Sequence, residues 1–370
     1  MKAMTEQASV KEPFIRIAKR NHMPFWQAAV VRAIALVLSL IVSALVIFMI
    51  VKMNPLDVYG AIFDGAFGTE RRIWITMRDM AVLLSLGIAL APAFKMKFWN
   101  IGAEGQMLMG GCATAACMIY SKNLPTWMIF ALMIAASLVA GAVWGVVPAI
   151  FKARFNTNET LFTLMMNYVA IQITSYCVAL WENPFGSNTV GIINRTTKYG
   201  WFPALFGQQY MLNVLIVLGL TIFMYIYLKC SKHGYEIAVV GDSENTARYA
   251  GISVNRVIIR TMLMSGAIAG LTGFIAVSGA SHTISTNTAG GRGFTAIIIA
   301  WLSKFNSFVM IAVTLLLVVL ERGAEEIASR FSLNNYASQM ITGIILFFIL
   351  GSEFFINYRL IFRGKAKKEA

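Results

Sequence analysis

Long apolar runs separated by short polar segments dominate this chain. An α-helix needs about 20 predominantly apolar residues to cross the hydrocarbon core of a bilayer. Runs of near-spanning length predict membrane helices at 33–51, 80–94, 107–120, 127–151, 161–181, 211–228, 261–278, 294–303, 307–320 and 337–357. The runs at 294–303 and 307–320 are short, so they are either half-helices or one broken span. We therefore predict an all-α polytopic membrane protein with about ten transmembrane helices, nine and eleven being the alternatives.

The distribution of basic residues predicts how these helices are oriented. With both termini inside, 21 of the 31 Lys and Arg residues lie at the inner ends of the spans or in inner segments, whereas the acidic residues divide 9 to 8. An excess of Lys and Arg on one side marks the cytoplasmic side. We therefore predict a multi-pass protein of the cytoplasmic (inner) membrane with both termini cytoplasmic. Its parts are a basic N-terminal segment at 1–32, a transmembrane domain at 33–357 containing a cytoplasmic loop at 229–260, and a basic tail at 358–370.

Composition supports the same class and excludes several others. Hydrophobic residues make up 58% of the chain and charged residues 13%, whereas soluble domains carry about 25% charged residues. The net charge of +14 is spread over several short loops, so it indicates orientation and contact with membrane lipid rather than a nucleic-acid partner. Residues 10–31 combine basic and apolar side chains and form either an interfacial segment or a solvated leader.

Motifs for catalysis and metal binding are missing from the sequence. Four cysteines without a Cys-x-x-Cys spacing and three scattered histidines give a metal site no support. We find no Gly-x-x-x-x-Gly-Lys-Ser/Thr loop, no Gly-x-Ser-x-Gly and no His-Glu-x-x-His. We therefore expect no catalytic residues, and any ATP used in transport must be hydrolysed by another chain.

A polar, glycine-containing break lies between the second and third apolar runs. It carries Asn100, Glu104 and Gln106 together with Gly102 and Gly105. Irregular polar backbone at membrane depth persists only where protein or a water-filled cavity satisfies it, and an ionisable residue there indicates a transport path. The alternative is a cytoplasmic loop in which the two glycines turn the chain.

A second polar cluster surrounds the start of the fifth predicted span. Asn158 and Glu159 either line the path or cap the helix. Asn167 lies two turns inside and requires a hydrogen-bond partner or the cavity. Amide side chains offer donors and acceptors that suit sugar hydroxyls or base edges. The predicted substrate-path residues are Asn100, Glu104, Gln106, Asn158, Glu159 and Asn167.

Glycines also suggest how the spans are arranged. A second break, at 288–294, lies on the outer side, opposite the first, and matched breaks of opposite orientation indicate an inverted 5+5 repeat. Gly141 with Gly145, and Gly266 with Gly270, form Gly-x-x-x-Gly pairs that allow close helix approach. We favour packing within one subunit over packing between subunits.

The loop at 229–260 contains a predicted short helix. Asp242 or Ser243 can cap it, it runs to about Ala250, and Gly251 suits its exit. Its small residues Ala247, Ala250 and Gly251 would let it sit deeply in a groove of a partner protein. The polar contacts would come from Glu244, Asn245 and Arg248. The alternative is an ordinary solvated helix.

Four segments together resemble the permeases of ATP-binding-cassette importers for nucleosides and simple sugars. These are Phe-Trp-Asn-Ile-Gly-Ala-Glu-Gly-Gln at 98–106, Asn-Glu-Thr-Leu at 158–161 with Leu-Met-Met-Asn-Tyr at 164–168, Gly-Asp-Ser-Glu-Asn-Thr-Ala-Arg-Tyr-Ala-Gly-Ile at 241–252, and Gly-Gly-Arg-Gly-Phe at 290–294. They follow the order of the family and extend over most of the chain. The resemblance implies the membrane-spanning subunit of an importer for a neutral polar solute, with nucleosides favoured over ribose-like sugars or riboflavin.

The resemblance also implies partners. A separate ATPase would bind ATP and Mg²⁺, so this chain itself would carry no cofactor. A second permease subunit (a copy or a relative) and an extracytoplasmic substrate-binding lipoprotein would complete the importer. The ATPase-coupling residues carried over by the resemblance are Gly241, Asp242, Asn245, Ala247, Arg248, Ala250 and Gly251. Outside this class, a secondary transporter would need acidic or histidine residues at mid-membrane for its coupling ion, and a membrane-embedded enzyme would need a catalytic constellation.

Overall fold

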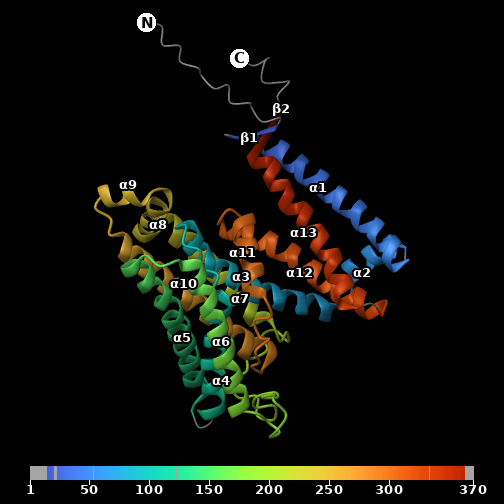
Figure 1. Cartoon of the computed structure of the whole chain (residues 1–370). Helices are drawn as coiled ribbons and strands as arrows, with labels where there is room; N and C mark the ends of the chain where they lie inside the picture. The colour runs from blue at the N-terminus through green and yellow to red at the C-terminus, as the bar shows by residue number, and fades with distance from the viewer. Residues whose placement is uncertain (1–14, 21–22, 53, 122–123, 333, 363–370) are drawn as a thin grey trace. The chain divides into compact units, whose positions relative to one another are not determined.

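The computed structural model describes residues 15–20, 23–52, 54–121, 124–332 and 334–362 (Figure 1). The chain divides into two compact units, one formed by 63–322 and the other by 1–62 with 323–370. Each of the ten predicted apolar runs is part of a helix. The helices are α1 Phe25–Val46, η1 Ile47–Val51, α2 Pro55–Phe67, α3 Glu70–Lys95, α4 Ala103–Tyr120, α5 Thr126–Phe155, α6 Glu159–Leu180, α7 Met211–Cys230, α8 Lys232–Asp242, α9 Glu244–Tyr249, α10 Val254–Ala276, η2 Val277–Ser281, α11 Arg292–Leu302, α12 Ser307–Arg330 and α13 Asn335–Asn357.

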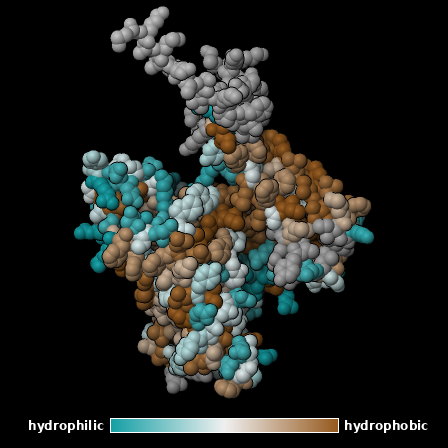
Figure 2. Space-filling view, in the orientation of Figure 1, coloured by the Kyte–Doolittle hydropathy of each residue, from teal (hydrophilic) through white to brown (hydrophobic). Residues whose placement is uncertain are grey.

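The fold is all-α and polytopic, as the apolar pattern predicts. Among the described residues, seven helices are both long and apolar enough to cross a membrane, and shorter apolar segments lie at Arg292–Leu302 and Gly343–Asn357. Large apolar side chains remain exposed along several of them, for example Val139 of α5 and Tyr176 of α6. Figure 2 shows hydrophobic residues over much of the surface and a concentration of hydrophilic residues over α8 and α9. Such outward apolar faces fit contact with lipid.

Close backbone packing joins α4, α5 and α10 at the centre of the 63–322 unit. A Cβ added to Gly141 of α5 would lie 2.2 Å from the carbonyl oxygen of Gly266, and one added to Gly270 would lie 2.9 Å from the Cα of Gly141. The two Gly-x-x-x-Gly pairs therefore pack against each other, which confirms the prediction of packing within one subunit. Small residues allow this approach because no side chain separates the two backbones.

Several helix ends differ from the predicted spans. α3 begins at Glu70, where the Thr69 side chain accepts a hydrogen bond from the Arg72 amide, ten residues before the predicted span at 80–94. α12 extends to Arg330 although it carries several charged residues beyond 320. α1 begins directly after Pro24 and therefore includes part of the predicted basic segment 1–32. Of these three ends, only the start of α3 has a side-chain cap among the described residues, provided by Thr69.

α11 is a half-length helix, one of the two alternatives predicted for its segment. Its 11 residues span roughly 16 Å at 1.5 Å per residue, about half of a hydrocarbon core of about 30 Å. It is preceded by an irregular segment at 282–291 and followed by a turn at 303–306. Within this unit, α8 and α9 lie at one end of the helices and the irregular loop 182–210 lies at the other (Figure 1).

The other unit joins the two ends of the chain. β1, Ile15–Lys19, pairs antiparallel with β2, Tyr358–Phe362, so that Ile15 lies opposite Phe362. α1 packs along α13, and Arg32 forms an ion pair with Glu353 at 2.5 Å. In its described part the N-terminal segment thus contains a strand at Ile15–Lys19 and the start of α1 from Phe25. Whether it lies at the membrane interface or is solvated stays a prediction.

Candidate functional site

The polar break predicted at 94–107 is a buried junction. α3 ends at Lys95 and α4 begins at Ala103, leaving irregular backbone between them. Asn100 is fully buried, and its Nδ2 donates to Gln106 Oε1 and to Ser265 Oγ, both at 3.3 Å. Its Oδ1 accepts from the Gly102 amide at 3.0 Å. The break is thus buried inside the protein, and its polar groups are satisfied by protein.

α6 holds this break in place through Asn167. The Asn167 Oδ1 accepts a hydrogen bond from the Gly105 amide at 2.8 Å, and its Nδ2 donates to the carbonyl of Ile101 at 2.9 Å. Thr163, one turn earlier, accepts from the Ile101 amide at 3.2 Å. Since Asn167 is buried and bonded on both sides, the structure gives it a role in bracing the α3–α4 connection. A direct contact between Asn167 and solute stays a prediction.

The start of α6 follows the capping interpretation. Asn158 is the N-cap residue, and its side chain accepts from the amides of Thr160 and Leu161. Glu159 lies in the first turn and forms an ion pair with Lys152 at 3.0 Å. Both residues therefore have a structural role at the helix end, and their contact with solute stays a prediction.

Glu104 joins the two breaks that the sequence predicts. Its Oε1 accepts a hydrogen bond from the amide of Gly291 at 2.9 Å. Gly293 packs on the same residue, because a Cβ added there would lie 2.9 Å from the Glu104 amide nitrogen. Segments almost two hundred residues apart thus meet at one carboxylate. The inverted repeat suggested by these breaks stays a prediction.

A polar cavity of about 350 Å³ adjoins this junction. The irregular segment 282–291 forms part of its wall and runs along α4, from Ile284 beside Gly111 to Gly291 beside Glu104. Gly111 is itself roughly 13 Å from the end of α4 at Tyr120. Irregular backbone at this depth requires protein or water as a partner. The cavity lining is Arg78, Asp79, Ala276, Ala280, Ser281, Thr283, Ser285, Asn287, Thr288, Gly290, Arg292 and Glu321.

A buried carboxylate organises three arginines beside this cavity. Asp79 of α3 is 3% exposed. Its Oδ1 lies 3.0 Å from Arg78 and 3.5 Å from Arg292, and its Oδ2 accepts from Arg322. Sequence analysis missed this cluster because Arg78 and Asp79 precede the apolar run and fell in a predicted loop. The signal that could have revealed the cluster is an acidic residue, Asp79, directly before an apolar run, where it can belong to the same helix.

The predicted helix in the 229–260 loop forms as α9. Ser243 is its N-cap, with its side chain accepting from the Thr246 amide, and Gly251 leaves it with a φ of +76°. Asp242, Asn245, Arg248, Ala250 and Gly251 are exposed, whereas Gly241 and Ala247 are buried. Ala247 therefore does not face outward as predicted, because it packs inside the chain. Tyr249, which the sequence analysis did not single out, is 94% exposed at the end of α9.

Comparison with known proteins identifies the family. Residues 73–350 match the family described as the permease component of branched-chain amino acid transport systems. The chain belongs to this family. The permease is 29% identical to the guanosine ABC transporter permease protein NupP of Bacillus subtilis over 340 residues, which cover 91% of this chain and 96% of that protein. It is 27% identical to the glucose ABC transporter permease protein TsgB13 of Haloferax volcanii over 361 residues, covering 94% and 93% of the two chains. It is also 27% identical to the nucleoside ABC transporter permease protein NupB of Lactococcus lactis over 327 residues, covering 85% and 89%.

The permease is therefore a multi-pass membrane protein of an ABC transport system. The match begins inside α3 and ends inside α13. It includes the junction at Glu104, the cavity beside Asp79 and the α8–α9 element. All three candidate regions thus belong to the shared permease architecture.

Proposed function

We propose that this permease carries nucleosides into the cell as the membrane-spanning subunit of an ATP-driven importer. The relatives named for guanosine and nucleoside transport support this choice of solute. A nucleoside is a neutral polar molecule, and hydroxyl and amide groups recognise its sugar and base edges. Ser285, Asn287 and Thr288 supply such groups to the cavity, and its volume suits a small ligand.

The proposed route rests on one contact, the hydrogen bond that the Gly291 amide donates to Glu104. Solute enters the polar cavity from the outer side and reaches Gly290, the cavity residue next to this contact. Opening the contact connects the cavity with the α3–α4 break and so with the inner side. Asn100, Gln106 and Asn167 hold the break in place through their hydrogen bonds. Glu104 faces the solute.

Two of the proposed partners bind at opposite ends of the helices. An ATPase subunit binds the exposed face of α9, which presents Asn245, Arg248 and Tyr249. It supplies the bound ATP and Mg²⁺. A second permease subunit, a copy of this chain or a relative, completes the path, and an extracytoplasmic binding protein delivers solute to the loop at 182–210.

Uptake in cells tests the solute. Inactivating the gene in its own organism should abolish ATP-dependent uptake of radiolabelled guanosine and uridine, and re-expression should restore it. Re-expression of Asn287→Ala should raise the apparent KM severalfold, whereas Thr196→Ala on the exposed outer loop should not. Unchanged nucleoside uptake in the inactivated strain would contradict the proposal.

A simple sugar is the second candidate solute. The relative named for glucose transport aligns with 94% of this chain, and others are named for fructose and, as probable, for riboflavin. The same inactivated strain distinguishes these alternatives, because loss of ribose, glucose or riboflavin uptake with intact nucleoside uptake would favour them.

The proposed orientation places both termini in the cytoplasm. Pairing of β1 with β2 supports an even number of crossings, because Ile15 and Phe362 must be on the same side. Reporter fusions after residue 195 should be external, and fusions after residues 245 and 365 internal. An external signal from the fusion at 365 would contradict this orientation.

A further inference from the structure

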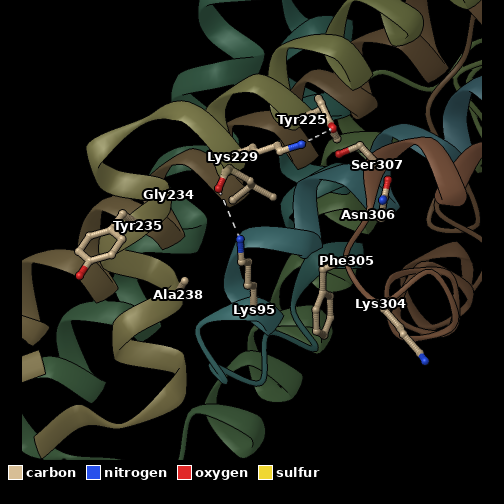
Figure 3. A pocket seen from close by; sticks show the side chains of 11 residues that line it. Lys95, Tyr225, Lys229, Gly234, Tyr235, Ala238, Lys304, Phe305, Asn306 and Ser307 are labelled. Atoms are coloured by element: carbon tan, nitrogen blue, oxygen red, sulfur yellow. Dashed lines mark hydrogen bonds between the residues drawn. The ribbon is translucent and has the colours of Figure 1, made fainter. Parts of the chain in front are cut away.

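Three lysines line a second cavity, of about 420 Å³, at the α8 end of the helices, and none of them forms an ion pair with a carboxylate in the described part of the chain. Lys95 is the last residue of α3, Lys229 lies at the end of α7, and Lys304 lies in the turn between α11 and α12. No Asp or Glu is among the described residues that line the cavity. Figure 3 shows the ammonium of Lys95 directed at the end of α7, that of Lys229 directed at Tyr225, and Lys304 at the rim with its ammonium turned outward.

Lys95 and Lys229 have only neutral oxygens as hydrogen-bond partners in the described structure. Lys95 Nζ donates to the carbonyl of Leu228 at 3.4 Å, and Lys229 Nζ donates to the hydroxyl of Tyr225 at 3.0 Å (Figure 3). An ammonium group has three donors, so both retain hydrogen-bonding capacity. Ser307, which also lines the cavity, is 1% exposed, and its Oγ has no hydrogen-bond partner in the described structure. Lys95, Lys229 and Ser307 therefore offer hydrogen-bond donors to the cavity, and no described residue that lines it supplies an anionic acceptor.

The position of the cavity indicates which class of anion it could bind. Lys95 and Lys229 stand at the ends of apolar helices, the level at which lysine side chains reach the headgroups of a bilayer. Ile222 and Ile226 of α7 are 50% and 53% exposed, and their spacing of three and seven residues from Lys229 puts them on its side of the helix. Phe308, 48% exposed, packs its ring 4.7 Å from that of Tyr225. An apolar surface therefore continues from the basic cavity along the helices.

We propose that this cavity binds the headgroup of an anionic phospholipid, whose acyl chains lie along α7. The phosphate accepts from Lys95 and Lys229, and Lys304 turns inward over it. A soluble phosphate would use the same donors but would make no contact with the exposed apolar side chains of α7, which the acyl chains of a lipid reach from the same headgroup position. Because the backbone of Lys95 also contacts Gly241 of α8, a bound lipid braces the end of α3 where α8 rests on it.

Lipid retention tests this site directly, whatever solute the permease carries. The full chain is purified and placed in nanodiscs of phosphatidylcholine with or without phosphatidylglycerol, and native mass spectrometry counts the lipids that remain bound. The test variant is Lys229→Gln with Lys304→Gln, because both side chains are exposed and their change should not unfold the protein. The matched control is Lys232→Gln with Lys198→Gln, which removes the same charge outside the cavity.

We expect the unmodified permease to retain phosphatidylglycerol and to gain thermal stability as its fraction rises. At about 1 kcal/mol for each lysine near anionic lipid, the test variant should bind it roughly 25-fold more weakly, and the control should not change. Equal retention by test and control variants, or equal retention of phosphatidylcholine, would overturn the proposal. Stabilisation by inorganic phosphate or glycerol phosphate that needs the same lysines, without retention of phosphatidylglycerol, would also overturn it in favour of a soluble ligand.

Discussion

Gly241 of α8 lies directly against the carbonyl oxygen of Lys95, the last residue of α3. A Cβ added to Gly241 would stand 2.2 Å from that oxygen, and Lys97 Nζ donates to the carbonyl of Asp242 at 3.4 Å. The α3–α4 break that holds Asn100 and Glu104 begins immediately after Lys95. A force on α8 and α9 therefore reaches the junction through backbone contact, without a flexible side chain between them.

Replacing Gly241 with valine should separate α8 from α3 and uncouple transport. The added side chain would meet backbone that cannot move aside locally, so we expect uptake to fall at least tenfold while the protein remains inserted. Uptake, membrane insertion and ATPase co-purification are measured together. Gly219→Val on α7 is the control, because a Cβ there meets nothing within 4 Å. Normal uptake by Gly241→Val would contradict the coupling role of this contact.

The exposed and buried faces of α9 should respond differently to substitution. Tyr249→Ala and Arg248→Glu alter exposed side chains, so they should reduce co-purification of the ATPase and leave the melting temperature unchanged. Ala247→Arg introduces a long charged side chain at a fully buried position. It should therefore lower the melting temperature, which the two exposed substitutions should not do. Full ATPase association by both exposed variants would show that this face is not the contact surface.

Asn167→Leu should destabilise the permease. It would leave the Gly105 amide and the Ile101 carbonyl without their partner, and such buried groups cost about 1–3 kcal/mol each. We expect lower melting temperature and lower expression together, with Tyr168→Leu, on the exposed side of α6, as the control. Reduced uptake with unchanged stability would instead indicate contact with solute.

Asp79→Asn should loosen the wall of the outer cavity. The substitution keeps the shape of the side chain but leaves Arg78, Arg292 and Arg322 without their shared carboxylate. Removing one partner from a buried ion pair typically costs about 3–5 kcal/mol. Thermal unfolding of Asp79→Asn is compared with that of Glu70→Gln, an exposed carboxylate on the same helix. An unchanged melting temperature for Asp79→Asn would show that the cluster is not a structural requirement.

The attachment of α8 should weaken as the pH falls. Burial lowers the pKa of His233 below its usual value, with Arg260 lowering it further and Glu236 opposing the shift; its ring contacts the hydroxyls of Tyr227 and Thr261. The unfolded state then binds the proton more readily, so the stability is complete above about pH 6.5 and is lost as the pH falls toward the folded-state pKa. The protection factors of α8 amides, which are exchange rates corrected for the intrinsic rate at each pH, should fall between pH 7.5 and 5.5, and His233→Gln should remove that dependence. An equal fall in protection in the variant would exclude His233 as the cause.

The sequence predicted the features that depend on neighbouring residues better than those that depend on contacts between distant segments. Apolar runs located every helix that is long and apolar enough to cross a membrane. Asn158 and Ser243 were each one of the alternatives considered as caps, and the Gly141 and Gly266 pairs were correctly assigned to one subunit. The start of α3 was missed because Arg78 and Asp79 resemble a loop until the arginines that neutralise Asp79 are known. The direction of Ala247 was also wrong, since a helix of six residues has no apolar period long enough to reveal its buried face.

The shortness of α11 has a consequence for the permeability barrier. On the proposed route, a solute that reaches Gly290 has already passed beside the irregular segment 282–291, and the length of α11, roughly 16 Å, separates it from the opposite end of the helices. Closure of the proposed path against water and ions therefore depends on contacts along this short helix and at its start, among them the hydrogen bond between Gly291 and Glu104.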